Sequence, residues 1–300
     1  MRLKKAFTMI ELIFVIVIMG ILSKFGVELI AQAYNSFLYS KINNELQANS
    51  STAVEFITKR LEYRIKGSEI IRNPITPSKT QLSASTSDEN ATVLEWIASD
   101  IDGFRGSSDN NTSAHLPNWS GILDLVDGNS SMLVSKETNT TKINNLIKNI
   151  SDSNISDVAL YFIGSGEGNT TSWGYDGNIT DQGELLHPIK PVAGQPTYFQ
   201  PAVSNFTGQR IYEYYQLTWT ANAVELVYDD VAHNGTLWFH YDYQPWKGEA
   251  YNTHGKSVIL MENVSSFQFR SVGSLIKIQV CVKSLLTNQE YSLCKEKTVF

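Results

Sequence analysis

Hydrophobic residues dominate the beginning of the chain. From Phe7 to Leu22 the sequence reads FTMIELIFVIVIMGIL, in which Glu11 is the one ionisable residue. A helix over this stretch is about 24 Å long and reaches about 36 Å if it continues to Ile30. The pattern predicts a membrane-spanning helix over residues 7–30, with the short basic leader 1–6 on the cytoplasmic side and the rest of the chain outside.

A helical spacing of apolar positions continues beyond this stretch. Intervals of three and four join Leu29, Ile30, Ala33, Tyr34, Phe37, Leu38, Ile42 and Leu46, and then Val54, Ile57, Leu61 and Ile65. This predicts an amphipathic stem helix over residues 31–67 that packs on a globular domain. The polar run Asn49 to Thr52 predicts a kink or restart, with Thr52 and Glu55 as a capping box.

The remaining chain favours β-structure. Residues 68–209 are predicted as a loop-rich region with short strands, namely a strand near 92–98, a hairpin of 122–127 and 132–136, a short helix at 142–150 and a strand at 158–163. Residues 164–209, rich in Gly and Pro, are predicted as long loops with little regular structure.

Alternating and aromatic runs in residues 210–300 predict successive antiparallel strands at 212–220, 223–228, 237–243, 257–260, 266–270 and 275–283. The predicted fold class is therefore α+β, with a long N-terminal transmembrane and amphipathic helix packed on a β-rich C-terminal domain.

Both cysteines lie near the C-terminus. Cys281 and Cys294 are equidistant from a predicted two-residue turn at Thr287 and Asn288. A hairpin about this turn puts them directly opposite each other, which predicts a disulfide. Two free thiols in an edge hairpin are the alternative, which we rank second because the rest of the chain indicates an oxidising compartment.

The composition limits the partners. Charged residues make up 18% of the chain and the formal net charge is −6, although the leader carries Arg2, Lys4 and Lys5. Broad binding to nucleic acid needs clustered Lys and Arg, so no direct nucleic-acid binding is predicted. Abundant Asn, Ser and Thr are typical of proteins outside the cytosol.

Glu11 is an anomaly in the apolar run, because a carboxylate in hydrocarbon costs about 2.5–3.5 kcal/mol. A cut between Ala6 and Phe7 would create an α-amino group four residues before Glu11, and each Glu11 could then neutralise the terminus of a neighbouring helix. Alternatively, Glu11 lies at the headgroup interface of a simple signal anchor. Physical chemistry alone leaves both open.

The segment KKAFTMIEL, from Lys4 to Leu12, resembles the leader and cleavage motif of type IV pilins and type II secretion pseudopilins. The resemblance implies that a prepilin peptidase cuts after Ala6, that Phe7 becomes an N-methylated mature terminus, and that Glu11 sets the filament register. Ala6 stands where the family usually has Gly. The C-terminal run LMENVSSFQFR followed by SLIKIQVCV also resembles minor pseudopilins of the J or W type.

The resemblance implies a non-enzymatic minor pseudopilin in a type II secretion or type IV pilus-like filament, serving protein secretion or DNA uptake. Its implied partners are other pilins or pseudopilins and the inner-membrane assembly platform. The chain would cross the inner membrane once, with its C-terminal domain in the periplasm, before it enters a filament. A surface pilus subunit in adhesion and a signal-anchored periplasmic binding or hydrolytic domain are the alternatives.

Acidic sequons form a second signal. Of 14 Asn-x-Ser/Thr triplets, seven carry Asp or Glu two residues before the Asn, whereas chance predicts about one to two. This pattern resembles the acceptor of bacterial periplasmic N-glycosylation, although Asp, Asn, Ser and Thr also co-occur in polar turns. The candidate acceptors are Asn90, Asn111, Asn129, Asn139, Asn154, Asn169 and Asn178.

No catalytic residue, metal site or cofactor is predicted from spacing. The five histidines are not clustered as metal ligands and are predicted to be surface or core residues. Two acidic runs, Asp100-x-Asp102-Gly103 and Asp176-x-Asn178-x-x-Asp181, offer oxygen ligands for calcium, but neither is a complete calcium loop.

Overall fold

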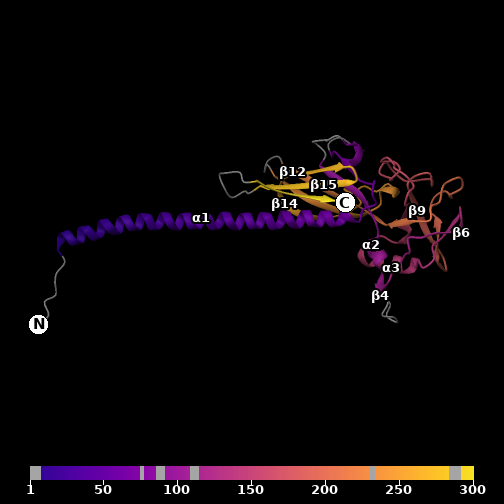
Figure 1. Cartoon of the computed structure of the whole chain (residues 1–300), viewed down its shortest axis with the longest axis horizontal. Helices are drawn as coiled ribbons and strands as arrows, with labels where there is room; N and C mark the ends of the chain where they lie inside the picture. Colours follow the sequence, from indigo (N-terminus) through magenta and orange to yellow (C-terminus); the bar gives the residue numbers. More distant parts are fainter. Residues whose placement is uncertain (1–7, 75–77, 86–91, 109–114, 230–233, 284–291) are drawn as a thin grey trace. The chain divides into compact units, whose positions relative to one another are not determined.

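The computed structural model describes residues 8–74, 78–85, 92–108, 115–229, 234–283 and 292–300. The chain divides into two compact units, Met1–Asn49 and Ser50–Phe300. Helix α1 (Met9–Glu62) belongs to both units, whereas the sheets belong to the second. The predicted α+β class is confirmed in this sense, since one long apolar N-terminal helix precedes antiparallel sheets (Figure 1).

Helix α1 is continuous through residues 49–52, so the predicted restart and its capping box are wrong. Ser and Thr cost a helix only a few tenths of a kcal/mol, and here burial outweighs that cost. Ser50 and Thr58 are themselves buried, and the Thr58 hydroxyl donates to the Val54 carbonyl at 2.8 Å. The helix ends at Glu62 rather than at residue 67, because the buried Arg64 already pairs with Ala98 of the sheet.

The larger sheet has eight strands in the order β16-β15-β14-β13-β12-β3-β1-β2. Its strands are β1 (Ile70–Arg72), β2 (Lys79–Gln81), β3 (Val93–Ala98), β12 (Thr220–Asp229), β13 (Asn234–Tyr243), β14 (Lys256–Val272), β15 (Leu275–Lys283) and β16 (Ser292–Val299). The last part of α1 packs on it, with the Phe56 and Phe239 ring centroids 5.0 Å apart. Ala53, Val54, Ile57 and Leu61 of this part are buried.

Strand β14 corrects one prediction, since the strands expected at 257–260 and 266–270 are a single strand. Its pairing with β15 shifts register between Val264 and Ser266, and Asn263 has a φ of 61°. A bulge of this kind interrupts the alternation of apolar and polar residues without ending the strand. The sequence pattern therefore predicts two strands where the backbone forms one.

The smaller sheet has six strands in the order β11-β8-β9-β10-β7-β6. They are β6 (Asp124–Asn129), β7 (Met132–Val134), β8 (Ala159–Phe162), β9 (Leu186–Val192), β10 (Gln195–Pro201) and β11 (Tyr215–Thr218). Helix α3 (Thr140–Ile150) lies between β7 and β8 in sequence and buries Ile143 and Ile147 in the same core as Phe199. The predicted hairpin, short helix and strand of this region are confirmed.

Residues 164–209 contain the hairpin β9–β10, so their prediction as loops is wrong for residues 186–201, whereas residues 164–185 and 202–209 have no helix or strand, as predicted. Proline usually marks a chain that does not form strands, because it donates no ladder hydrogen bond. Here the Pro188 carbonyl still accepts from the Ala202 N–H at 2.8 Å, and the pairing shifts register between Gln195 and Phe199. The strands use carbonyl acceptors and a register shift to accommodate their prolines.

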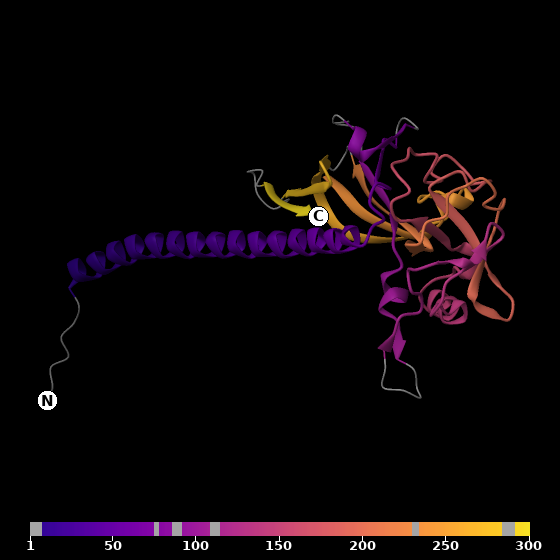
Figure 2. The same cartoon turned by 45° about the vertical axis from the view of Figure 1, so that its right-hand side comes forward.

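The short elements are α2 (Ile101–Arg105), the pair β4 (Ser107–Ser108) and β5 (His115–Leu116), and the 3-10 turns Leu82–Ala84, Ile155–Asp157 and Pro245–Lys247. The two main sheets occupy different parts of the second unit (Figure 2). Trp219 alone separates β11 of the smaller sheet from β12 of the larger one. Strands from residues 68–209 and 210–300 mix in both sheets, so these ranges do not fold as separate domains.

Candidate functional site

The first candidate site is the apolar segment, defined as residues 9–30 of α1. Its large apolar side chains are all exposed within this chain, from Val15 at 44% to Met9 at 86%. Among the described residues, α1 is the one helix that is long and apolar enough to cross a membrane, with a mean hydropathy of 2.3 in its most apolar window. A membrane anchor and a signal sequence both have this character. Exposed apolar surfaces of this size are typical of segments that contact a membrane or another protein.

Glu11 lies in the first turn of α1 and is held by the residue that begins the helix. The Thr8 N–H donates to Glu11 Oε2 at 3.0 Å, and the Thr8 hydroxyl donates to the same oxygen at 2.9 Å. A Glu that reaches back in this way satisfies a backbone donor that has no partner within the helix. The carboxylate thus points toward the N-terminal end of α1. Ala6 and Phe7, the predicted cleavage pair, lie outside the described residues.

Glu28 gives a useful comparison on the same segment. It is exposed and, among the described residues, it has no hydrogen bond or ion pair, including none to Lys24. Glu11 and Glu28 are thus the same residue type on one apolar segment, but Glu11 accepts two hydrogen bonds from Thr8 and Glu28 accepts none among the described residues.

Cys281 of β15 and Cys294 of β16 form a disulfide, and they are directly paired in the register of the two strands. The predicted bridge is confirmed. The turn predicted at Thr287 and Asn288 lies outside the described residues. The disulfide closes the C-terminal hairpin at the edge of the larger sheet, which fits an oxidising compartment.

The structure describes five of the seven acidic sequons, since Asn90 and Asn111 lie outside the described residues. Asn129, Asn169 and Asn178 are exposed. Asn139 and Asn154 are half-buried, and each caps a helix, α3 in one case and the turn Ile155–Asp157 in the other. Asn139 and Asn154 therefore have a structural role in the fold, since Asn is a strong helix-capping residue.

Neither calcium candidate has a free set of oxygen ligands. Asp176 accepts from the hydroxyls of Thr170 and Thr171 and pairs with Lys79 at 3.3 Å. In the part of the chain that the structure describes, no group of three or more His, Cys, Asp or Glu side chains could hold a metal ion. Asp102 and Asp181 belong to no such group of described residues.

Asp100 has a different role, at the junction of the two sheets. It is buried and accepts hydrogen bonds from the Gly103 N–H at 3.0 Å and from the indoles of Trp119 at 3.1 Å and Trp219 at 3.3 Å. Burial raises the pKa of Asp100 to about 6, although these hydrogen bonds favour its charged form. The sequence did not reveal this site, because its partners are distant along the chain.

A buried ion pair joins the neighbouring strands β1 and β3 of the larger sheet. Glu95 of β3 is fully buried, pairs with Arg72 of β1 and accepts from the Tyr243 hydroxyl at 3.0 Å. The Arg72 guanidinium lies 5.8 Å from the Tyr175 ring centroid and 5.7 Å from that of Tyr251. Burial lowers the pKa of Arg72, but the charge of Glu95 raises it, and the net shift is upward.

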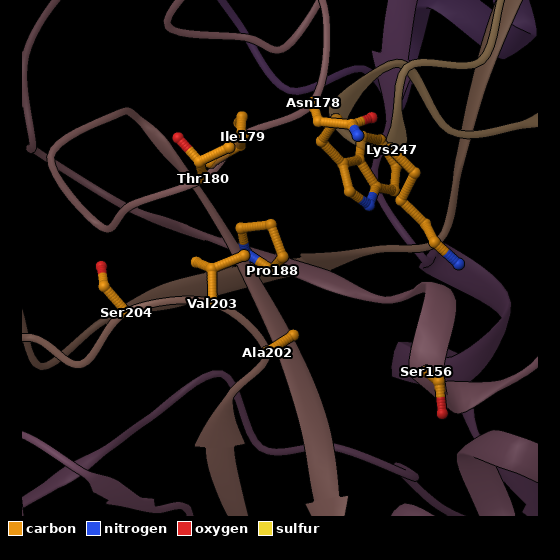
Figure 3. A pocket seen from close by; sticks show the side chains of 10 residues that line it. Ser156, Asn178, Ile179, Thr180, Pro188, Ala202, Val203, Ser204 and Lys247 are labelled. Atoms are coloured by element: carbon orange, nitrogen blue, oxygen red, sulfur yellow. The ribbon is translucent and has the colours of Figure 1, made fainter.

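An open pocket of about 560 Å³ lies beside the turn Pro245–Lys247 (Figure 3). Its lining consists of Ser156, Asn178, Ile179, Thr180, Pro188, Ala202, Val203, Ser204, Trp246 and Lys247. Lys247 is the one titratable residue in this lining, and its ammonium pairs with Asp157. The lining thus lacks a base and nucleophile pair.

The two buried histidines of the described residues, His187 and His240, are packed against aromatic rings. The ring of His187 lies 4.5 Å from the Phe162 ring centroid and its Nδ1 contacts Gln182 Oε1 at 3.0 Å. Burial lowers the pKa of His187 to about 4. His240 lies 3.1 Å from Glu225 and packs edge-on against Tyr251. Both belong to the packed interior, His115 and His254 are exposed, and His233 lies outside the described residues.

Comparison of the chain with known protein families, with curated protein sequences and with solved structures finds no match.

Proposed function

We propose that this chain is a minor pilin-like subunit, a pseudopilin, which is anchored in the inner membrane by residues 7–30 and then assembles into an envelope filament. The observation that carries the proposal is Glu11, a carboxylate in the first turn of a helix whose large apolar side chains are exposed throughout residues 9–30. The local resemblance of KKAFTMIEL to the prepilin leader supplies the class.

Processing would give Glu11 a partner. A prepilin peptidase that cuts between Ala6 and Phe7 leaves an α-amino group at Phe7, which N-methylation keeps basic. Two unit charges about 4 Å apart interact by about 4 kcal/mol at an effective dielectric constant of 20. This is comparable with the cost of about 2.5–3.5 kcal/mol for a carboxylate in hydrocarbon, so pairing with a neighbour's terminus offsets the burial of Glu11.

The exposed apolar segment supports the same proposal. Its side chains bury area first against lipid and then against neighbouring subunits, and lipid-facing apolar groups do not by themselves drive helix association. The charge pair therefore decides where along the helix two subunits align. The other pilins or pseudopilins of the filament and the inner-membrane assembly platform are the proposed partners.

The second unit is proposed to lie in the periplasm. The disulfide Cys281–Cys294 supports an oxidising location, and the basic leader supports a cytoplasmic N-terminus. The filament would serve protein secretion or DNA uptake.

Substitution of Glu11 tests the proposal. Full-length Glu11→Ala and Glu11→Gln chains are expressed with the native filament machinery, and the fraction of protein in sheared filaments is compared with that in membranes. Both variants are expected to assemble at least about tenfold less, because the α-amino group of the neighbouring subunit is left unpaired among apolar side chains, and a loss of about 1.4 kcal/mol changes an equilibrium tenfold. Glu11→Gln keeps the size of the side chain but not its charge.

Glu28→Ala is the matched control, because it removes the same carboxylate elsewhere on the apolar segment. It is expected to assemble as the unchanged chain does. An unchanged urea midpoint in every variant shows that the second unit has folded. Assembly of Glu11→Ala at the normal level would refute the proposal, as would an equal defect in Glu28→Ala.

A further inference from the structure

The acidic sequons differ in how far the fold leaves their acceptor nitrogen available. In Asn-linked glycosylation the side-chain nitrogen Nδ2 becomes the attachment atom, and the transferase must bind the Asn together with the residues on either side of it. Three features therefore distinguish the five described sites. They are the exposure of the Asn, the hydrogen bonds of its Nδ2, and the contacts that hold the flanking acid and hydroxyl.

Asn154 is locked into a cap. Its Nδ2 donates to Asp157 Oδ2 at 2.9 Å, and its Oδ1 accepts from the Ser156 N–H at 2.9 Å. Its own backbone N–H donates to the same Asp157 oxygen at 2.7 Å. Modification of Nδ2 requires this capping box to open.

Asn139 is held by the start of helix α3. Its Oδ1 accepts from the N–H groups of Thr141 and Lys142 at 3.1 and 3.0 Å. Thr140 is buried, and Thr141, the hydroxyl residue of this sequon, lies within the helix. An enzyme that binds the sequon as an extended chain has to unwind the first turn of α3.

Asn178 is exposed, but its neighbours are held. Ile179 is 5% exposed and packs in the core with Trp246. Asp176, the acid two residues before Asn178, accepts from two threonine hydroxyls and pairs with Lys79. Binding of this sequon requires the acid to leave these partners and the isoleucine to leave the core.

Asn129 and Asn169 leave both the amide nitrogen and the upstream acid available, although the Thr171 hydroxyl of the Asn169 sequon donates to Asp176 at 2.9 Å. Asn129 lies at the tip of the β6–β7 hairpin, where its acid, Asp127, is 57% exposed and has one surface ion pair, to Lys136. Asn169 follows Glu167, which is exposed and has no partner among the described residues. Neither Asn129 nor Asn169 has a hydrogen bond to Nδ2 in the described part of the chain. Their Oδ1 atoms accept only short-range bonds, from Ser131 and Ser172.

We propose that Asn129 and Asn169 are glycosylation sites of the folded protein, and that Asn139, Asn154 and Asn178 are not. The donor is an oligosaccharide linked to a polyprenyl diphosphate. The Asn Nδ2 forms a bond to the anomeric carbon of the sugar, the bond from that carbon to the diphosphate oxygen breaks, polyprenyl diphosphate leaves, and the amide loses one proton to a base of the transferase.

The test combines the folded full-length chain in detergent, a purified bacterial oligosaccharyltransferase that needs an acid two residues before the Asn, and a synthetic polyprenyl-diphosphate-linked oligosaccharide. Mass spectrometry of peptides measures the occupancy of each site. Asn129 and Asn169 are expected to be at least about tenfold more occupied than Asn139, Asn154 and Asn178, because the capped sites must first give up their cap bonds. Short synthetic peptides of all five sequons are expected to lose this difference.

Variants of the acids complete the test. Glu167→Gln is expected to abolish modification of Asn169 and to leave Asn129 unchanged, and Asp127→Asn is expected to do the reverse. Asp181→Asn is the control, since it removes an exposed acid that precedes no sequon. Equal occupancy of Asn154 and Asn169 in the folded chain would overturn the proposal. So would unmodified Asn129 and Asn169 when their peptides are accepted, or an unchanged Asn169 in Glu167→Gln. The result does not depend on Glu11 or on filament assembly.

Discussion

Removal of Arg72 is expected to destabilise the second unit far more than removal of an exposed cation. Arg72→Met keeps an unbranched side chain of similar length but leaves the carboxylate of Glu95, which is fully buried, with the Tyr243 hydroxyl as its remaining partner. Breaking a buried pair in this way costs about 3–5 kcal/mol. Loss of the contacts with the rings of Tyr175 and Tyr251 adds to the cost, by about 0.5–1 kcal/mol each.

Arg72 and Glu95 are not equally buried. Glu95→Met leaves Arg72 unpaired, but the Arg72 side chain is 14% exposed whereas that of Glu95 is 0% exposed. The guanidinium can therefore recruit water, and Glu95→Met is expected to cost less than Arg72→Met. The double variant with Met at both positions removes both charges. It is expected to be more stable than Arg72→Met, because replacement of a buried pair by apolar residues is often neutral or favourable.

Urea unfolding, followed by tryptophan fluorescence of the full-length chain in detergent, measures these differences in the free energy of unfolding. Lys59→Met is the matched control, because Lys59 pairs with Glu62 on the surface, at side-chain exposures of 67% and 49%. Such pairs contribute about 0–1 kcal/mol. The reasoning would be refuted if Arg72→Met cost no more than Lys59→Met, or if the double variant were as unstable as the sum of its two single variants.

Three other predictions concern the stability of the second unit. Replacement of Cys281 and Cys294 by Ala should lower the free energy of unfolding by about 3 kcal/mol in the chain-entropy account, and equal urea midpoints with and without the bridge would contradict it. The pKa of Asp100 in the folded chain is about 6, above its ordinary value. The contribution of protonated Asp100 to the free energy of unfolding is therefore complete at pH below that ordinary value, and it is lost as the pH rises through 6. The unchanged chain should therefore lose about 3 kcal/mol relative to Asp100→Asn over this window, and parallel pH profiles would contradict this. Ile57→Ala should cost about 2–5 kcal/mol because Ile57 is fully buried, whereas Ile30→Ala, at an exposed position of the same helix, should leave the urea midpoint unchanged; equal effects would contradict the assignment of Ile57 to the core.

Local patterns predicted those elements that local physics controls. The apolar run and the helical spacing predicted α1, and the equal distance of Cys281 and Cys294 from a turn predicted their register in β15 and β16. The prolines of β9 and β10 misled the prediction, because proline indicates a loop unless its carbonyl and a register shift maintain the pairing. Ser50 misled it as well, since a polar residue can be buried within a helix when it is small.

Long-range contacts could not be read from the sequence. Asp100 and Trp219 meet at the junction of two sheets although 119 positions separate them. Arg72 and Glu95 are partners because β1 and β3 are neighbours in the larger sheet, an order that no local pattern encodes. The sequons show the same limit, since composition locates Asn154 and Asn169 equally well but only the fold shows that the Asn154 amide is bonded.

The identity of the mature N-terminus decides whether Glu11 gains the α-amino partner proposed for it. Intact-mass measurement of the protein recovered from native membranes and filaments reports whether the leader has been removed. The recovered chain is expected to begin at N-methylated Phe7, with the disulfide between Cys281 and Cys294 present. A chain in assembled material that still begins at Met1 would contradict it, because Glu11 would then lack the α-amino partner that processing is proposed to create.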